Sequence, residues 1–314
     1  MRYRLLLPLF GMLLFAFILL NIDIGETVRI LSGADILLIF LAAFTALIAV
    51  AIKSLKWKMV IGLYDKDYAL ASAMKSWLMG FSFSMATPAR LGDLSRAYYL
   101  KGRMGLGKGL VTVVADRIAD ITVLFCLAFL GFISFAGMFA GYAGLVLTVL
   151  AFFILFLLAV YLSTRKRLAR ILLRPVAARI VPSRYWPDFS SVFHDFYRNL
   201  GSVRNGKRNM ILLFVLSALA WFVSVLEYYL LALSIGLGVS YLFLLSAMPI
   251  VVLLDLLPIS LSGIGTRDAA LIFFFSLISI GKEYAVSFSI LVFVFSYAFL
   301  GLIGAVLMLR ERAA

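Results

Sequence analysis

Long apolar runs follow one another along the whole chain, and they restrict its possible folds more than any other feature. Of the 314 residues, 64% are hydrophobic and 14% are charged, and the mean hydropathy is +1.10. A helix of about 20 apolar residues spans the hydrocarbon core of a bilayer, whereas a soluble domain needs far more polar surface. We therefore expect an all-α, polytopic protein of the cell membrane, with one transmembrane domain over residues 1–314 and no soluble domain.

Charged residues at the ends of the apolar runs predict the orientation of the chain. Lys and Arg gather in cytoplasmic loops, so arginines near both ends predict cytoplasmic termini: Arg2, Arg4, Arg310 and Arg312. The first run lacks a small-residue cleavage site, so we expect it to remain as a membrane helix, followed by an outer loop over residues 21–35. The same rule places three lysines at the cytoplasmic end of the second span: Lys53, Lys56 and Lys58.

The longest polar region, residues 163–209, is strongly basic. Between Arg165 and Arg208, eleven Lys or Arg residues stand against two Asp, a net charge of +9. Such a cluster is typical of a cytoplasmic loop beside an anionic leaflet, and we expect no nucleic-acid partner. Apolar residues at helical spacing predict a helix over residues 188–200, lying either on the membrane face or against the ends of the bundle.

The sequence offers few ligands for a metal or a cofactor. Its one cysteine, Cys126, lies in an apolar run, and its one histidine, His194, lies in the basic loop. The glycines of Gly105-Leu-Gly-Lys-Gly109 do not have the spacing of a P-loop. We therefore expect no metal and no cofactor.

Ionisable residues occur inside the apolar background in two short stretches, Thr87–Arg96 and Asp116–Asp120. Each such group costs roughly 2.5–3.5 kcal/mol at the membrane centre on the translocon scale, so these stretches are the first candidates for a functional site. A straight span through Pro88 would place the next Lys and Arg residues outside, against the positive-inside rule. A hairpin from the cytoplasm, with its tip at Pro88 and its second arm over residues 91–100, removes this conflict and is our expectation; an ordinary helix with an exceptional loop is the alternative.

A second interruption, Pro258–Gly265, separates the apolar runs Tyr241–Leu257 and Thr266–Ile280. A helix of fifteen residues is only about 23 Å long, against about 30 Å for the hydrocarbon core. Two short spans or one hairpin from outside, with its tip at Pro258, both fit, and we expect the hairpin. The whole chain is then predicted to have about six to eight transmembrane helices plus two re-entrant hairpins.

The two interruptions share a layout, which predicts a pseudo-inverted repeat. Each has a Pro, a nearby Gly, and an Arg close to an acid: Pro88, Gly92, Asp93 and Arg96 in the first, and Pro258, Gly263, Gly265, Arg267 and Asp268 in the second. Paired segments of this kind in the two halves of a transporter point to a binding site at the midplane.

Together with Asp116-Arg117-x-x-Asp120, these motifs resemble the lysylphosphatidylglycerol synthase transmembrane region, also known as the flippase-like or UPF0104 integral membrane protein family. The resemblance covers nearly the whole chain and implies a role in moving lipid between leaflets, an aminoacylated lipid in the full-length synthases. Those proteins continue into a soluble aminoacyl-transferase domain, which we expect to be absent because the chain stops at Ala314. Relatives that occur with glycosyltransferases imply a polyprenyl phosphate-linked glycan lipid as an alternative substrate. The second motif of the family usually has Glu where this chain has Asp268.

A lipid phosphate that leaves water needs new hydrogen-bond donors. Guanidinium groups stay charged when buried and can bond two phosphate oxygens at once, which makes four arginines candidates: Arg90, Arg96, Arg117 and Arg267. Gly92 and Gly265 lie where half-helices would begin, so backbone N–H groups could also approach the phosphate there.

The acids are expected to pair with these arginines. Asp93 and Arg96, like Arg117 and Asp120, are three residues apart and can share a helix face. Asp116 and Asp120 also share a face and repel each other unless a cation lies between them: a hairpin arginine, a substrate amine or a shared proton. The alternative is an ion network that only locks helices together. Two further acids are expected inside the membrane: Glu227 and Asp255.

These expectations favour a lipid flippase that is not an enzyme. Its substrate would be an anionic or aminoacylated phospholipid or a polyprenyl phosphate lipid, and a separate synthase or glycosyltransferase is a candidate partner. An enzyme that acts on lipid in the membrane plane, and a non-transporting scaffold for a glycosyltransferase or synthase, are the competing classes.

Overall fold

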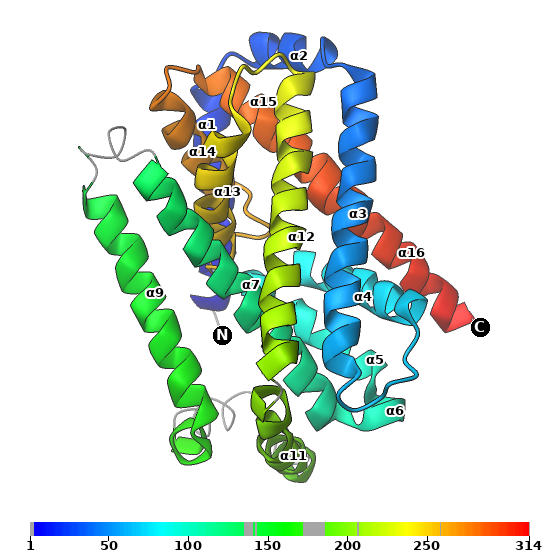
Figure 1. Ribbon diagram of the computed structural model, residues 1–314. Helices are drawn as coiled ribbons and strands as arrows, with labels where there is room; N and C mark the ends of the chain where they lie inside the picture. Colours follow the sequence, from blue (N-terminus) through cyan, green and yellow to red (C-terminus); the bar gives the residue numbers. More distant parts are fainter. Residues whose placement is uncertain are drawn as a thin grey trace.

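The computed structural model describes residues 3–134, 141, 143–171, 186–205, 207–257 and 259–313. Within these ranges, helix is the only regular secondary structure (Figure 1). The predicted all-α class is therefore confirmed.

Four helical segments of the described chain are long and apolar enough to cross a membrane. They are α3 (Ile36–Ile61), α9 (Ala143–Thr164), the part Arg208–Ser234 of α12 (Lys207–Ser234), and Lys282–Glu311, which comprises α15 (Lys282–Val292), η4 (Phe293–Ala298) and most of α16 (Phe299–Ala313). A bent pair, α1 (Tyr3–Leu20) and α2 (Ile24–Ser32), would make a fifth, with 91° between residues 10–20 and 24–32. The total number of spans and the entry of hairpins into a membrane stay predictions.

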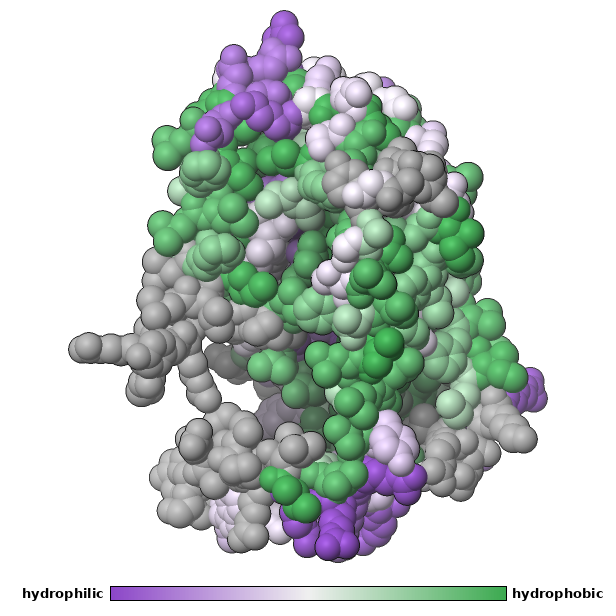
Figure 2. Space-filling view, turned by 90° about the vertical axis from the view of Figure 1, so that its left-hand side faces the viewer, coloured by the Kyte–Doolittle hydropathy of each residue, from purple (hydrophilic) through white to green (hydrophobic). Residues whose placement is uncertain are grey.

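The surface is divided into an apolar middle and two polar ends. Figure 2 shows mainly hydrophobic residues over the middle of the molecule, with hydrophilic residues gathered at the top and bottom. Large apolar side chains on α3 and α9 are exposed, among them Phe40, Phe44, Leu147 and Leu155. Such a belt is what a lipid environment requires, so the molecule is a multi-pass membrane protein.

The residues expected to form an outer loop contain a helix. α2 lies across the top of the molecule, and Asp23 caps it by accepting a hydrogen bond from the Glu26 N–H at 3.0 Å (Figure 1). The charged residues in this segment had indicated a loop, but an Asp cap with an acid in the first turn is also a helix start.

The helices α3 and α12 pack along each other, and α7 (Leu106–Ser134) crosses below them (Figure 1). α13 (Tyr241–Asp255) packs against the upper part of α7, where Gly131 meets Ser246. A Cβ at Gly131 would overlap the Ser246 side chain, so the glycine is what permits this close crossing.

The first interrupted segment turns back on itself. α4 (Leu70–Met85) ends before Thr87, and the 3-10 helix η1 (Pro88–Ser95) folds against it. A Cβ at Gly92 would overlap the Phe83 backbone, so the contact requires glycine. The helix therefore does not run straight through Pro88. The choice between a re-entrant hairpin and an ordinary helix with an exceptional loop stays a prediction.

Two short helices follow η1 in the chain. They are α5 (Arg96–Tyr99) and α6 (Lys101–Met104).

The second interrupted segment occupies the upper half of the molecule (Figure 1). α13 is followed by an irregular stretch and by α14 (Thr266–Ser276), which packs beside it; the expected tip residue, Pro258, lies outside the described residues. The two segments meet end to end, because the Ser262 hydroxyl donates a hydrogen bond to the Met85 carbonyl at 2.8 Å.

The helix predicted in the basic loop is α11 (Trp186–Asn205), at the bottom of the molecule (Figure 1). It packs against α7, and Asn199 accepts a hydrogen bond from the Tyr64 hydroxyl at 2.8 Å. Burial raises the pKa of the Tyr64 phenol. The expected packing against the bundle is therefore present, and the position of α11 relative to the membrane face stays a prediction. The basic residues between 172 and 185 lie outside the described part.

Both chain ends lie in the lower half of the molecule, the half that contains α11 (Figure 1). Their common side agrees with the predicted topology, and its cytoplasmic location stays a prediction.

Candidate functional site

Four buried charges meet where α3, α5 and α7 converge, and we call them the α7 ion cluster: Lys56, Arg96, Asp116 and Asp120. The Lys56 ammonium lies 2.9 Å from Oδ1 of Asp116 and also donates to Oδ1 of Asp120. Nη1 of Arg96 donates to Oδ2 of Asp116 at 3.0 Å. Each charge in this cluster thus has an opposite charge in contact, as buried ions require.

Lys56 is the cation that separates Asp116 from Asp120. Sequence analysis placed this lysine at the cytoplasmic end of the second span and did not include it among the site residues, but Lys56 has no exposed surface. α3 continues to Ile61, which carries Lys56 inside the bundle. The sequence contained one signal that Lys56 belongs with other interior residues: Lys53 and Lys56 are three residues apart and therefore share a helix face.

The expected pairs within one helix are not formed. Arg117 forms an ion pair with the carboxylate of Asp93, and Nε of Arg96 bonds only the Asp93 backbone carbonyl, at 3.4 Å. Asp120 pairs with Lys56 instead of Arg117. These exchanges tie η1 and α3 to α7.

Two residues shape the space for Arg96. Its guanidinium lies 4.9 Å from the ring centre of Trp57, a cation–π contact. A Cβ at Gly80 of α4 would overlap the Arg96 side chain, so the aliphatic part of Arg96 occupies the space that a side chain at position 80 would fill.

A second cluster joins the two interrupted segments, and we call it the Tyr297 cluster: Arg90, Asp255, Arg267 and Tyr297. The Tyr297 hydroxyl donates to Oδ2 of Asp255 at 2.6 Å and accepts from Nη2 of Arg90 at 2.6 Å. Arg90 and Asp255 also form an ion pair at 3.5 Å. Arg90 has a φ of 53°, a conformation that is uncommon for a residue with a side chain and that is held here by its partners.

Arg267 contacts the same tyrosine from the second segment. Its guanidinium lies 5.1 Å from the Tyr297 ring centre, and it donates to the Ser289 hydroxyl at 3.0 Å and to the Ser262 carbonyl at 3.2 Å. Because Arg267 bonds only neutral partners among the described residues, its charge is not compensated by a direct ion pair.

The other predicted residues of the second segment have structural contacts. Asp268 accepts a hydrogen bond from the Gly265 N–H at 2.8 Å and so caps α14. A Cβ at Gly263 would overlap the Asp255 carboxylate. Both glycines have positive φ, 78° and 83°, which glycine adopts without strain.

A small internal cavity of about 40 Å³, which we call the central cavity, is lined by residues of both halves. Its polar lining includes Lys53, Arg90, Trp221, Ser224, Glu227 and Tyr297. Sequence analysis proposed Glu227 and Arg90 but missed Lys53, Trp221 and Tyr297, because a lysine near a helix end and two aromatic residues carry no distinctive pattern.

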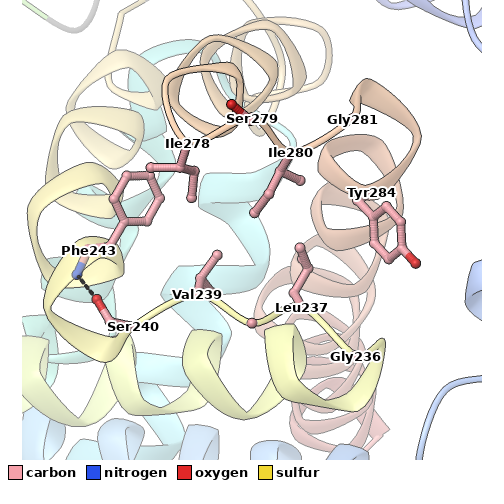
Figure 3. Close-up of a pocket in the computed structure, with 11 residues that line it drawn as sticks. Gly236, Leu237, Val239, Ser240, Phe243, Ile278, Ser279, Ile280, Gly281 and Tyr284 are labelled. Atoms are coloured by element: carbon pink, nitrogen blue, oxygen red, sulfur yellow. Dashed lines mark hydrogen bonds between the residues drawn. The ribbon is translucent and has the colours of Figure 1, made fainter. Parts of the chain in front are cut away.

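A larger space, about 600 Å³, lies at the top of the molecule between the α12–α13 and α14–α15 connections. Figure 3 shows the apolar side chains of Leu237, Val239, Ile278 and Ile280 converging on it. None of its lining residues is charged, so it offers no site for ionic chemistry.

Comparison with known proteins finds relatives of similar length. A UPF0104 membrane protein of Methanocaldococcus jannaschii is 25% identical over 302 residues, covering 93% of this chain and 90% of the relative. UPF0104 membrane proteins of Pyrococcus horikoshii and Methanothermobacter thermautotrophicus are each 23% identical, over 98% and 86% of this chain and 97% and 84% of their own lengths. The family described as the lysylphosphatidylglycerol synthase TM region matches residues 5–304. The chain therefore belongs to the lysylphosphatidylglycerol synthase transmembrane-region family.

Proposed function

We propose that the protein is a flippase, which moves a lipid with a phosphate-containing headgroup between leaflets, and that it is not an enzyme. The observation that carries this proposal is the Tyr297 cluster, in which Arg90 of one interrupted segment bonds Asp255 and Tyr297 of the other half. Charged groups at membrane depth, joined across two broken helical segments, are the arrangement that transporters use for polar cargo.

The chemistry of the cluster suits a phosphate. Arg90 and Arg267 both stack on Tyr297, with 5.0 and 5.1 Å between guanidinium carbon and ring centre. A guanidinium offers a planar pair of donors that matches two phosphate oxygens. The ion pair of Arg90 with Asp255 is long, at 3.5 Å, so a phosphate oxygen would be a competitive partner for the arginine.

The proposed movement separates the two tips. Among the described residues, polar links between them include the Arg90–Asp255 pair and the hydrogen bond from Ser262 to Met85. Breaking these contacts while a headgroup replaces them would expose the cavity to one side and then to the other, which is alternating access.

A lateral groove supplies a path for the acyl chains. It has a volume of about 610 Å³ and is lined by residues including Phe83, Ser95, Tyr98 and Met308. Tyr99 and Glu311 complete its lining, and Ser95 directly precedes the buried Arg96, so the groove lies beside the segment that carries the charges. The headgroup would then travel inside while the tails stay in the bilayer.

Leaflet exchange of labelled phospholipids in reconstituted liposomes tests the proposal. We expect the unmodified protein to accelerate exchange and Arg90→Gln to reduce the rate by at least about tenfold, because one charged hydrogen bond of about 1.5–3 kcal/mol is lost. Arg103→Gln is the matched control, since Arg103 forms its ion pair with Asp65 on the surface and should leave the rate unchanged.

Two outcomes would contradict the flippase, and a third would contradict the role of the Tyr297 cluster. Exchange equal to that of empty liposomes for phospholipids and polyprenyl phosphate lipids would favour a scaffold. Conversion of the lipid to a product would favour an enzyme. Equal loss of exchange in Arg90→Gln and Arg103→Gln would show that the Tyr297 cluster has no specific role in transport. Mass spectrometry of co-purifying lipid separates the two substrate classes.

A further inference from the structure

The last long helical span is not a regular α-helix over its whole length. η4 (Phe293–Ala298) is a π-helix between α15 and α16, and the Phe299 N–H bonds the Val294 carbonyl, five residues back. A π-helix has i→i+5 hydrogen bonds, is rare, and occurs mostly as a single wide turn inside an α-helix, often at a functional site. We call η4 the wide turn of this span.

The two polar side chains of the wide turn lie where the interrupted segments meet. Ser296 donates to the Glu227 carboxylate of α12. Tyr297 donates to Asp255 at the end of α13 and accepts from Arg90 of η1. The positions of both hydroxyls therefore depend on the register of the helix at η4.

Arginines from both interrupted segments lie against the rings of the wide turn. Arg267 of α14 is 5.5 Å from the Phe293 ring centre and 5.1 Å from that of Tyr297. Arg90 is 5.0 Å from the Tyr297 ring centre. These cation–π contacts, together with the hydrogen bonds of the two hydroxyls, stabilise the wide turn at its present position.

A wide turn can move along a helix without unfolding it, because the next turn takes up the extra residue. The residues that it passes rotate by about 100° and advance by about 1.5 Å. A shift by one turn toward the C-terminus passes Ser296 and Tyr297, and the rotation removes both hydroxyls from their partners. A shift toward the N-terminus leaves the two residues in place.

The residues after η4 favour the C-terminal direction. Gly301 lies in the first turn of α16, and glycine is a weak helix former, so this turn is easily distorted. A Cβ at Gly301 would overlap the Met85 side chain, so α16 touches the end of α4 at this point. The Met85 carbonyl accepts the hydrogen bond from Ser262. A wide turn at Gly301 would therefore change the packing beside the contact between the two tips.

We propose that η4 is the element that opens the junction: its wide turn moves by one turn toward Gly301 and rotates Ser296 and Tyr297 away from their partners. This inference rests on the proposed function and deepens it by naming the device that controls access to the central cavity. Ser296, Tyr297 and Leu300 line that cavity, so the same shift changes its walls. One helix thereby releases both interrupted segments together.

Deletion of Val294 tests the inference, because it removes the extra residue of the wide turn. Val294 is 41% exposed, so the deletion takes away little interior packing and leaves a continuous α-helix with the flanking residues in their present orientation. We expect this variant to keep the thermal stability of the unmodified protein and to exchange labelled phospholipids at least about tenfold more slowly. Val294→Ala is the matched control, since it shortens the side chain but keeps the backbone residue, and it should exchange lipid at the unmodified rate.

Hydrogen exchange of backbone amides in nanodiscs tests the movement without a deletion. Amides of residues 294–299 should exchange at least about tenfold faster than those of residues 286–292 in α15, because each shift breaks their hydrogen bonds. Tyr297→Phe keeps the ring but loses the bonds to Asp255 and Arg90, so it should speed amide exchange over residues 294–299 further. Tyr284→Phe, on α15 and outside the cluster, is the matched control and should leave these amides unchanged.

Three results would overturn the inference. They are a folded deletion variant that exchanges lipid at the unmodified rate, amides of residues 294–299 as well protected as those of α15, and no effect of Tyr297→Phe on these amides. If the deletion variant does not fold, the amide comparison decides. The two proposals fail separately. Absence of lipid exchange by the unmodified protein would contradict the flippase, whereas rapid lipid exchange with a fixed wide turn would contradict only this inference.

Discussion

Lys56 lies between two carboxylates of one helix, and this position explains how α7 can carry Asp116 and Asp120 on one face. The two acids are buried, and the cation between them offsets their mutual repulsion. The lysine also donates to the Ser217 hydroxyl of α12, at 3.2 Å. One residue thus joins three helices, α3, α7 and α12.

We expect Lys56→Met to destabilise the protein by about 3–5 kcal/mol, because it leaves the buried Asp120 carboxylate without a cation and Asp116 with Arg96 alone. Denaturant-induced unfolding in detergent micelles measures the change. Lys58→Met, on the same helix and outside the cluster, is the control and should change stability by less than about 0.5 kcal/mol. Equal stability of the two variants would show that Asp116 and Asp120 do not depend on Lys56.

At the scale of elements, sequence patterns predicted where helices occur and where they break. The apolar run 69–87 became α4, the run 211–235 became most of α12, and the run 241–257 became α13. Apolar runs report burial or lipid contact of a whole segment, and Pro and Gly end helices for local reasons, so a single sequence contains this information.

Partners in space could not be predicted in the same way. Lys56 with Asp116, Arg117 with Asp93 and Arg90 with Asp255 are contacts between different elements. The i, i+3 rule that suggested Asp93 with Arg96 applies within one regular helix, and η1 is a 3-10 helix that turns Asp93 toward α7. The sequence patterns therefore placed the candidate residues inside the bundle. Which of them pair with each other is seen only in the three-dimensional structure.

The contact of η1 with α4 gives a prediction at this scale. Gly92→Ala should destabilise the protein by about 1–3 kcal/mol, because the added methyl overlaps the Phe83 backbone and moves η1 away. Thermal unfolding in detergent measures the loss. Gly102→Ala is the control, since a Cβ there meets nothing within 4 Å, and it should change stability by less than about 1 kcal/mol. A neutral Gly92→Ala would mean that the two elements can separate freely.

At the scale of the whole molecule, the two interrupted segments meet where the Ser262 hydroxyl bonds the Met85 carbonyl. The cavity and the Tyr297 cluster both lie at this junction, so movement of one half relative to the other changes both at once. In the proposed mechanism, contacts with the protein replace the water around a charged headgroup. The headgroup would be released where those contacts break.

A reversible cross-link between the tips tests this coupling. We expect Met85→Cys with Ser262→Cys, in a Cys126→Ser background, to form a disulfide under oxidising conditions, because the Ser262 side chain already contacts the Met85 backbone. Oxidation should stop leaflet exchange, and a reductant should restore it. Each single-cysteine variant is the control and should not respond to oxidant. Undiminished exchange in the cross-linked protein would show that the tips need not part.

The close contact of α1 with the second segment has a consequence for biogenesis. Gly11 lies against Ser260 and Gly265, where a methyl group on either glycine would overlap its neighbour. These residues come from opposite ends of the chain, so the first helix is made long before its partner exists. During synthesis this face of α1 has to be covered by lipid or by the insertion machinery, and the last apolar runs complete the packing of the first.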